Sequence, residues 1–139
     1  MVFERKKITI RSKGALPSVP FVDLRDKILG KNYELSISFV GPLEAKKINQ
    51  KYRNKSYVPN TLSFSLSKNS GEIVMCLSEA KKQYKDFEMD FEKYVLFLVI
   101  HSMLHLKGYD HSSKMEGREK HFLSLFSKRH NEKTNRSRH

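Results

Sequence analysis

The chain has 139 residues and a formal net charge of +12, with 38% apolar and 30% charged residues. These values predict one soluble globular domain with enough length for a buried core. They argue against a membrane-spanning protein, because the longest apolar run, residues 95–100, is far shorter than the roughly 20 residues that cross a bilayer. Cys76 is the only cysteine and lies in an apolar run, so we expect a buried structural thiol. The first residues lack a secretory signal, and we therefore expect a cytoplasmic protein.

Much of the positive charge lies in two blocks at the ends of the chain. Residues 1–13 hold five basic side chains against one acidic side chain, and residues 127–139 have the same balance. A basic surface of this size attracts phosphate backbones. Because the same charge can also serve solubility alone, it favours a nucleic-acid partner without establishing one.

Local patterns predict two strand–helix units in the first half of the chain. The predicted elements are a strand at 7–11, a helix that starts at 18–20 and stops at Gly30, a strand at 33–40 and a helix at 42–53. Pro42 suits the first position of the second helix. In that helix, Leu43, Ile48 and Tyr52 are expected to face the core.

The second half is predicted to contain a hairpin followed by three helices. A loop at 54–60 leads to strands at 61–66 and 72–77, which are joined by a turn at 68–71. Ser78 can cap a helix that runs to about Phe87, and Asp90 can cap one at 91–107 that Gly108 ends. A capping box, Ser113 with Glu116, predicts a last helix to about Lys128.

These elements have the order βαβαββααα and predict a single compact α+β domain. The first units favour parallel strands and the hairpin adds an antiparallel edge, which gives a mixed four-stranded sheet with helices packed on it. We assign residues 1–127 to this domain. Residues 128–139 form a polar, basic tail that we expect to be disordered.

A histidine cluster in and just after the fourth predicted helix, 91–107, carries the chemistry. His101 and His105 are separated by four positions and share one helix face, so both imidazoles can reach one metal ion. Gly108 lets the chain turn back and deliver His111 three residues later. Three protein ligands leave a fourth position open, which is typical of a catalytic zinc site. A metal ion there can lower the pKa of a bound water towards about 7.

The spacing of this cluster is that of the metzincin proteases, with one departure. Those enzymes have a glutamate general base directly after the first histidine, and this chain has Ser102 there. Peptide hydrolysis by that route therefore lacks its base. The residues leave the identity of the general base open.

The motif His101-x-x-x-His105-x-x-Gly108-x-x-His111 resembles the signature of the YbeY family, bacterial metal-dependent endoribonucleases implicated in ribosomal RNA maturation. The resemblance spans roughly residues 33–126. Further matching blocks are Asn49 with Tyr52-Arg53, then Leu62-Ser63-Phe64, Gly71-Glu72-Ile73, and Met115 with Glu119.

The resemblance implies the family's α+β fold and one divalent metal ion, usually taken as Zn²⁺, held by His101, His105 and His111. It implies that Arg53 is catalytic, and a guanidinium at that helix end could bind a phosphate or stabilise transition-state charge. The implied substrate is single-stranded RNA in ribosomal RNA precursors, at the 3′ end of the small-subunit RNA. The small ribosomal subunit is an implied partner.

Several residues depart from the family's pattern or have open roles. Glu72, Pro59 and Thr61 replace the family's usual Asp, Thr and Val, which affects details of substrate contact and not the metal ligands. Asp110 could accept a hydrogen bond from a ligand imidazole or cap the turn. Tyr109 and Phe64 could stack on bases, although Phe64 suits the core. The other three histidines, His121, His130 and His139, are expected to lie outside the site.

Two other functions compete with an endoribonuclease. A non-catalytic ribosome-assembly factor would use the metal for structure or RNA positioning, and the missing glutamate motivates this alternative. A metallohydrolase acting on a small ester or amide would need a narrow pocket, for which the sequence holds no signal.

Overall fold

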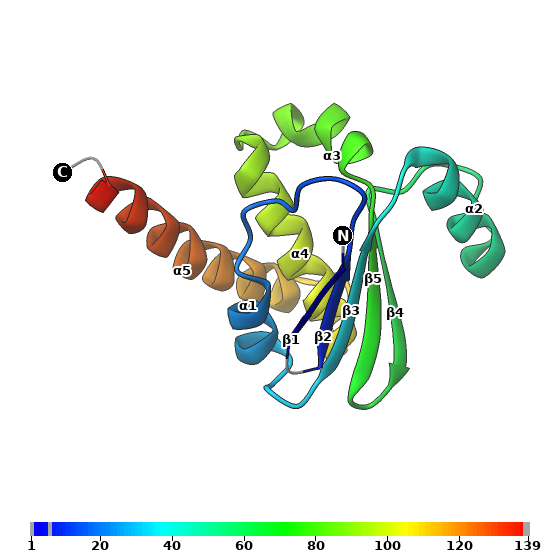
Figure 1. Cartoon of the computed structure of the whole chain (residues 1–139), viewed down its shortest axis with the longest axis horizontal. Helices are drawn as coiled ribbons and strands as arrows, with labels where there is room; N and C mark the ends of the chain where they lie inside the picture. Colours follow the sequence, from blue (N-terminus) through cyan, green and yellow to red (C-terminus); the bar gives the residue numbers. More distant parts are fainter. Residues whose placement is uncertain (1, 6, 138–139) are drawn as a thin grey trace.

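The computed structural model contains a five-stranded sheet with helices packed against it (Figure 1). It describes the backbone of residues 2–5 and 7–137 and the side chains of residues 7–127. The strands are β1 (Val2–Arg5), β2 (Ile8–Arg11), β3 (Glu34–Phe39), β4 (Thr61–Ser67) and β5 (Ser70–Met75). The helices are α1 (Phe21–Ile28), α2 (Pro42–Arg53), α3 (Leu77–Gln83), the 3-10 helix η1 (Tyr84–Phe87), α4 (Phe91–Lys107) and α5 (Ser113–Ser137).

The sheet has the strand order β1-β2-β3-β5-β4 and is mixed, as predicted. The central strands β2, β3 and β5 are parallel, and the β4–β5 hairpin adds the antiparallel edge. The predicted α+β class is confirmed. Strand β1, which was not predicted, pairs antiparallel with β2 and makes the sheet five-stranded where four strands were expected. Two of its four residues are charged, and the segment has no alternation of apolar and polar residues that would predict a strand. The segment is a strand because it pairs with β2.

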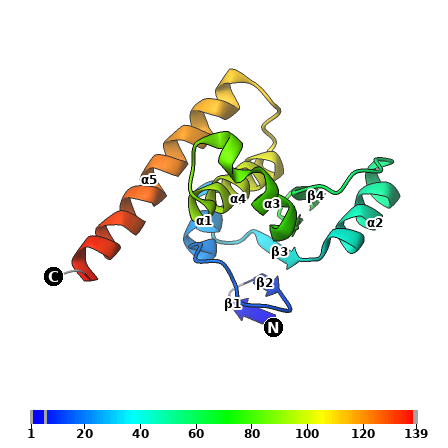
Figure 2. The ribbon, with the colours of Figure 1, turned by 90° about the horizontal axis from the view of Figure 1, so that it is seen from above.

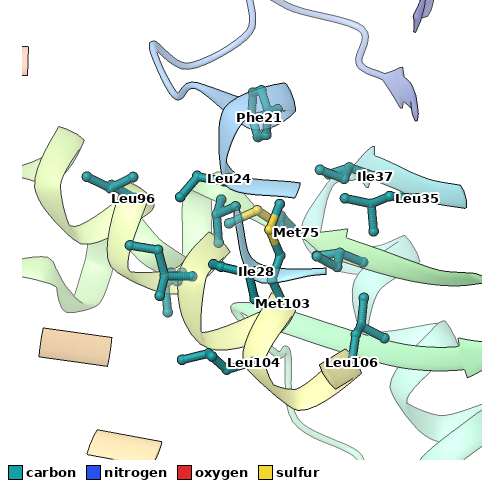
Figure 3. Close-up of a cluster of buried hydrophobic side chains, with 14 of the residues drawn as sticks. Phe21, Leu24, Ile28, Leu35, Ile37, Met75, Leu96, Met103, Leu104 and Leu106 are labelled. Atoms are coloured by element: carbon teal, nitrogen blue, oxygen red, sulfur yellow. The ribbon is translucent and has the colours of Figure 1, made fainter. Parts of the chain in front are cut away.

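One face of the sheet forms the core. Ile10, Ile37 and Ile73 are register partners on three neighbouring strands, and each is at most 1% exposed. Figure 3 shows side chains from α1, β3, β5 and α4 meeting between this face and the helices. Cys76 is buried beside the sheet, which confirms the predicted structural thiol. No helix within the described residues has the length and apolar character needed to cross a bilayer.

Helix α2 has the predicted bounds but not the predicted buried face. Leu43 and Tyr52, expected to face inward, are 78% and 62% exposed, and Ile48 is only partly buried. Ala45 and Asn49 are the buried residues instead. The prediction was wrong because α2 stands out from the body beyond β4 and buries only a narrow stripe (Figure 2).

The last helix differs from its prediction at both ends. Its N-terminal cap is Ser112, whose hydroxyl accepts from the Met115 N–H at 3.3 Å, one residue earlier than the predicted capping box. At the other end α5 runs to Ser137, past the predicted end at Lys128. Residues 118–137 contain no glycine or proline to break a helix. The domain boundary after residue 127 and the disordered tail stay predictions.

Candidate metal centre

Helix α4 is a capped, buried element that fixes the position of two histidines. The Asp90 carboxylate accepts from the Lys93 N–H at 2.8 Å, as predicted for an N-cap. At the other end Gly108 has φ +112°, a left-handed conformation that favours glycine. The chain reverses there and returns towards the helix. His101 and His105 therefore lie on one face of the last turns of a rigid helix, and the reversal brings His111 to them.

The three predicted histidines meet at one point. One ligand nitrogen from each of His101, His105 and His111 lies within 4.8 Å of the other two. The Nε2 atoms of His101 and His105 are 3.1 Å apart. Two nitrogens bound to one tetrahedral zinc ion would be about 3.3 Å apart, given Zn–N distances of about 2.0–2.1 Å. The residues therefore fit a metal ion, as the spacing predicted.

The opposite ring nitrogens of two of these histidines have fixed partners. His101 Nδ1 lies 3.1 Å from Glu119 Oε2, and His105 Nδ1 lies 3.0 Å from the Tyr109 carbonyl oxygen. Each Nδ1–H can donate to its oxygen, which leaves the Nε2 lone pair directed at the shared point. This arrangement is typical of metal-binding histidines.

The surroundings of His105 favour its neutral form. Burial lowers the pKa of His105 below its ordinary value, and the neighbouring charge of His101 lowers it further. The hydrogen bond to the Tyr109 carbonyl opposes these effects. A neutral imidazole is the form that binds a metal ion, so the site favours the ligand state of this residue.

Glu119 is a site residue that the sequence analysis did not assign. It comes from α5, 18 positions after His101, and is only 8% exposed. Helical spacing held a signal for it, because Met115, Phe122 and Phe126 are buried on the same face of α5. The hydrogen bonds described for His101 and His105 go to Glu119 and to the Tyr109 carbonyl and not to Asp110, and a capping role for Asp110 stays a prediction.

Ser102, which stands where a metzincin has its glutamate, joins α4 to the sheet. Its hydroxyl lies 2.8 Å from Thr61 Oγ1 on β4 and donates to the Leu98 carbonyl at 2.8 Å. Ser102 is fully buried. The side chain therefore faces β4, and the centre has no base at this position.

The metal centre opens towards the surface through a cavity of about 630 Å³ between α4 and α5. Its lining includes His101, His111, Phe97, Glu116 and Glu119. His111 is exposed, so the shared point of the three histidines is reachable from solvent. Such an opening gives no support to a narrow pocket for a small ester.

Arg53 ends α2 and has an exposed side chain. None of the hydrogen bonds or ion pairs described for residues 7–127 joins it to the histidines. Helices α2 and α4 do contact the same strand, β4, through Tyr52 with Phe64 and through Ser102 with Thr61. His121 lies on α5 outside the histidine cluster, as predicted, and the side chains of His130 and His139 lie outside the described residues.

An α+β fold with three converging histidines that are open to solvent fits one class of protein, the mononuclear metallohydrolases. Comparison with known proteins gives the family. The model of the family described as endoribonuclease YbeY matches residues 16–127. The chain belongs to this family, whose members are hydrolases that act on RNA.

Several curated relatives carry the name endoribonuclease YbeY. The chain is 32% identical to that of Alkaliphilus metalliredigens over 127 residues, which cover 84% of this chain and 79% of the relative. It is 37% identical to that of Clostridioides difficile over a region that covers 67% of this chain and 71% of the relative. It is 40% identical to that of Finegoldia magna, over 58% of this chain and little more than half, 57%, of the relative.

A solved structure has the same fold. The solution structure of a Thermotoga maritima protein superposes with a TM-score of 0.64 at 25% identity, covering 91% of this chain and 93% of that one. This likeness shows the fold, whereas the family and the named relatives support RNA cleavage in ribosomal RNA maturation as the function. A non-catalytic assembly role is not favoured.

Proposed function

We propose that the chain binds one Zn²⁺ ion through His101, His105 and His111 and hydrolyses phosphodiester bonds in single-stranded RNA. The observation that carries the proposal is the convergence of the three imidazoles, two of which already have their Nδ1 atoms engaged. Imidazole donors suit zinc, and three protein ligands leave a position free for substrate. A bound zinc ion supplies Lewis acidity that polarises a phosphoryl oxygen.

The other tasks fall to the chain's own residues. Glu119 and the Tyr109 carbonyl hold the ligand rings in one orientation. Phe97, whose ring centroid lies 5.9 Å from that of His101, limits water on one side of the centre. Arg53 binds a phosphate of the substrate with its guanidinium and stabilises the charge that develops during cleavage.

We propose ribosomal RNA precursors as the substrate, with cleavage at the 3′ end of the small-subunit RNA, the small ribosomal subunit as partner and the cytoplasm as location. Membership of the family supports the RNA class. The net charge of +12 supports a polyanionic substrate, because lysine and arginine side chains release counterions from RNA on binding.

The test measures bound metal and RNA cleavage in the wild type, His105→Ala, Arg53→Ala and the control His121→Ala. Wild type and control are expected to hold one equivalent of zinc and to cleave a single-stranded precursor. His105→Ala should lose both properties, whereas Arg53→Ala should keep the metal and lose about a hundredfold or more in cleavage rate. Metal without cleavage in the wild type would refute the nuclease, and no metal would refute the centre itself.

A further inference from the structure

We propose that α2 and the loop after it, residues 42–57, form a docking surface for single-stranded RNA outside the metal centre. The inference rests on the proposed function for its choice of ligand. It concerns binding of RNA and not the cleavage step, so the two can be tested separately.

Helix α2 is poorly covered by the rest of the fold. Of its twelve residues, Ala45 and Asn49 are the buried ones, and the helix makes only slight contact with any other element. Figure 2 shows it standing clear of the body beyond β4. Large apolar or aromatic side chains therefore remain in solvent, with Leu43 at 78%, Tyr52 at 62% and Tyr57 at 55% exposure. A folding role alone does not account for them.

The same segment carries a concentration of cations without acidic partners. The basic residues are Lys46, Lys47, Lys51 and Lys55, against a single acid, Glu44, and Arg53, proposed above to act in cleavage, is not counted among them. All four lysines are exposed, and none takes part in an ion pair described for residues 7–127. Unpaired cations gathered on one projecting element form a local positive field that attracts a phosphate backbone.

Aromatic rings are interleaved with these cations. The Tyr52 ring packs edge-on against Phe64 of β4, with centroids 5.6 Å apart, and the Lys51 ammonium lies 5.2 Å from the Tyr52 centroid. Asn49 donates its side-chain N–H to the Tyr57 carbonyl at 3.0 Å, which holds the loop beside the helix. Tyr52 and Tyr57 are thus held in place but remain exposed, and each lies near a lysine in the sequence. Their rings are suited to stacking on unpaired bases while the lysine ammonium groups contact phosphates.

The arrangement favours RNA over a membrane surface. Leu43 and Tyr52 are nine positions apart, which puts them about 180° apart around a helix with 3.6 residues per turn. A helix that lies in a membrane interface needs one continuous apolar face. The stacking sites also favour single strands, because the base faces of a duplex are already stacked.

Helix α2 and the helix that carries His101 and His105 are linked through one strand of the sheet. Helices α2 and α4 meet the same edge strand, β4, through Tyr52 with Phe64 and through Ser102 with Thr61. An RNA strand bound on α2 would therefore lie beside the strand that contacts the histidine-bearing helix.

The test measures binding of a fluorescent single-stranded RNA to the full-length protein at several salt concentrations, with a gel to verify that the RNA stays intact. One variant is Lys51→Gln with Lys55→Gln. Its matched control is Lys31→Gln with Lys68→Gln, which removes the same charge at the opposite end of the sheet. Tyr57→Ala is paired with Tyr57→Phe, which keeps the ring. Thermal unfolding verifies that each variant folds.

The α2 lysine variant is expected to weaken binding and to flatten the slope of log K against log salt by about 1.4, since a single-strand contact contributes about 0.7. Tyr57→Ala should weaken binding about fivefold or more, as expected for one lost base stack, while Tyr57→Phe binds like the wild type. Equal losses in the control lysine variant, or wild-type binding by Tyr57→Ala, would overturn the proposal. The proposal would also be overturned if these variants lost binding to acidic lipid vesicles but bound RNA like the wild type.

Discussion

Among single residues, two oxygen atoms that would not bind the metal orient the histidine rings of the candidate centre. Glu119 contacts His101, and the Tyr109 carbonyl contacts His105. The carbonyl is fixed by the turn at Gly108, whereas Glu119 is a side chain that a mutation can remove. It is therefore the residue through which the orientation of a ligand can be tested without changing a ligand.

Glu119→Ala is expected to weaken zinc affinity about 10- to 100-fold, because His101 loses the acceptor that orients its ring. Glu119→Gln should weaken zinc affinity less, since the amide oxygen of glutamine can accept the same hydrogen bond. Competition with a chromophoric chelator measures the affinity. Glu116→Ala, which changes an exposed residue of the same cavity, is the matched control. Equal zinc affinities for Glu119→Ala and the wild type would show that His101 needs no such partner.

Among the helices and strands, the position of α4 depends on its close packing against the sheet. Gly71 on β5 has no room for a side chain. A Cβ atom there would lie against the Tyr33 hydroxyl, 2.8 Å from Leu106 Cδ2 and 3.1 Å from the Phe64 carbonyl oxygen. Leu106 belongs to the last turn of α4, next to His105. The glycine lets the sheet approach the part of the helix that carries the histidines.

Gly71→Ala is expected to lower the free energy of unfolding by about 1–3 kcal/mol through overpacking. Tyr33→Phe removes the hydroxyl that the new Cβ would meet. That hydroxyl is buried and has no hydrogen-bond partner among the described residues, so its loss should cost little. The double variant should recover part of the stability, and urea unfolding of the four proteins measures the coupling. If the effects of the two substitutions on the free energy of unfolding are strictly additive, the strain in Gly71→Ala does not come from contact with the Tyr33 hydroxyl.

Stability and metal binding are coupled to pH at the scale of the whole molecule. The pKa of His105 in the folded, metal-free protein lies below its ordinary value, for which burial is the main cause. The unfolded chain therefore takes up the proton first as pH falls. The contribution of His105 to the stability of the metal-free protein is therefore fully present above about pH 6.5, the ordinary histidine value, and is lost as pH falls from there through the folded pKa.

Urea unfolding of the metal-free protein at pH 7.5 and pH 5 is expected to show lower stability at pH 5, with a smaller change in His105→Gln. The metal-loaded protein should also release its zinc in acid, because the ligands must be neutral imidazoles. Zinc content unchanged at pH 4 would contradict a three-histidine site.

Local sequence signals accounted for the helix that carries the centre. Asp90 and Gly108 act within one turn of the backbone, so the bounds of α4 follow from the sequence alone, and the i, i+4 spacing then puts His101 and His105 on one face. The glycine turn and His111 are also local. These features, with the resemblance to the family, predicted the cluster of three histidines and the mixed sheet.

Only the tertiary structure decided the rest, because it depends on elements far apart in the sequence. The exposure of Leu43 and Tyr52 depends on α2 finding little surface to cover, which its own apolar pattern does not encode. The contact of Glu119 with His101 depends on how α5 packs on α4. The strand β1 exists through its pairing with β2. The sequence by itself thus determined which three histidines come together, while long-range packing decided what orients them and which surface remains open.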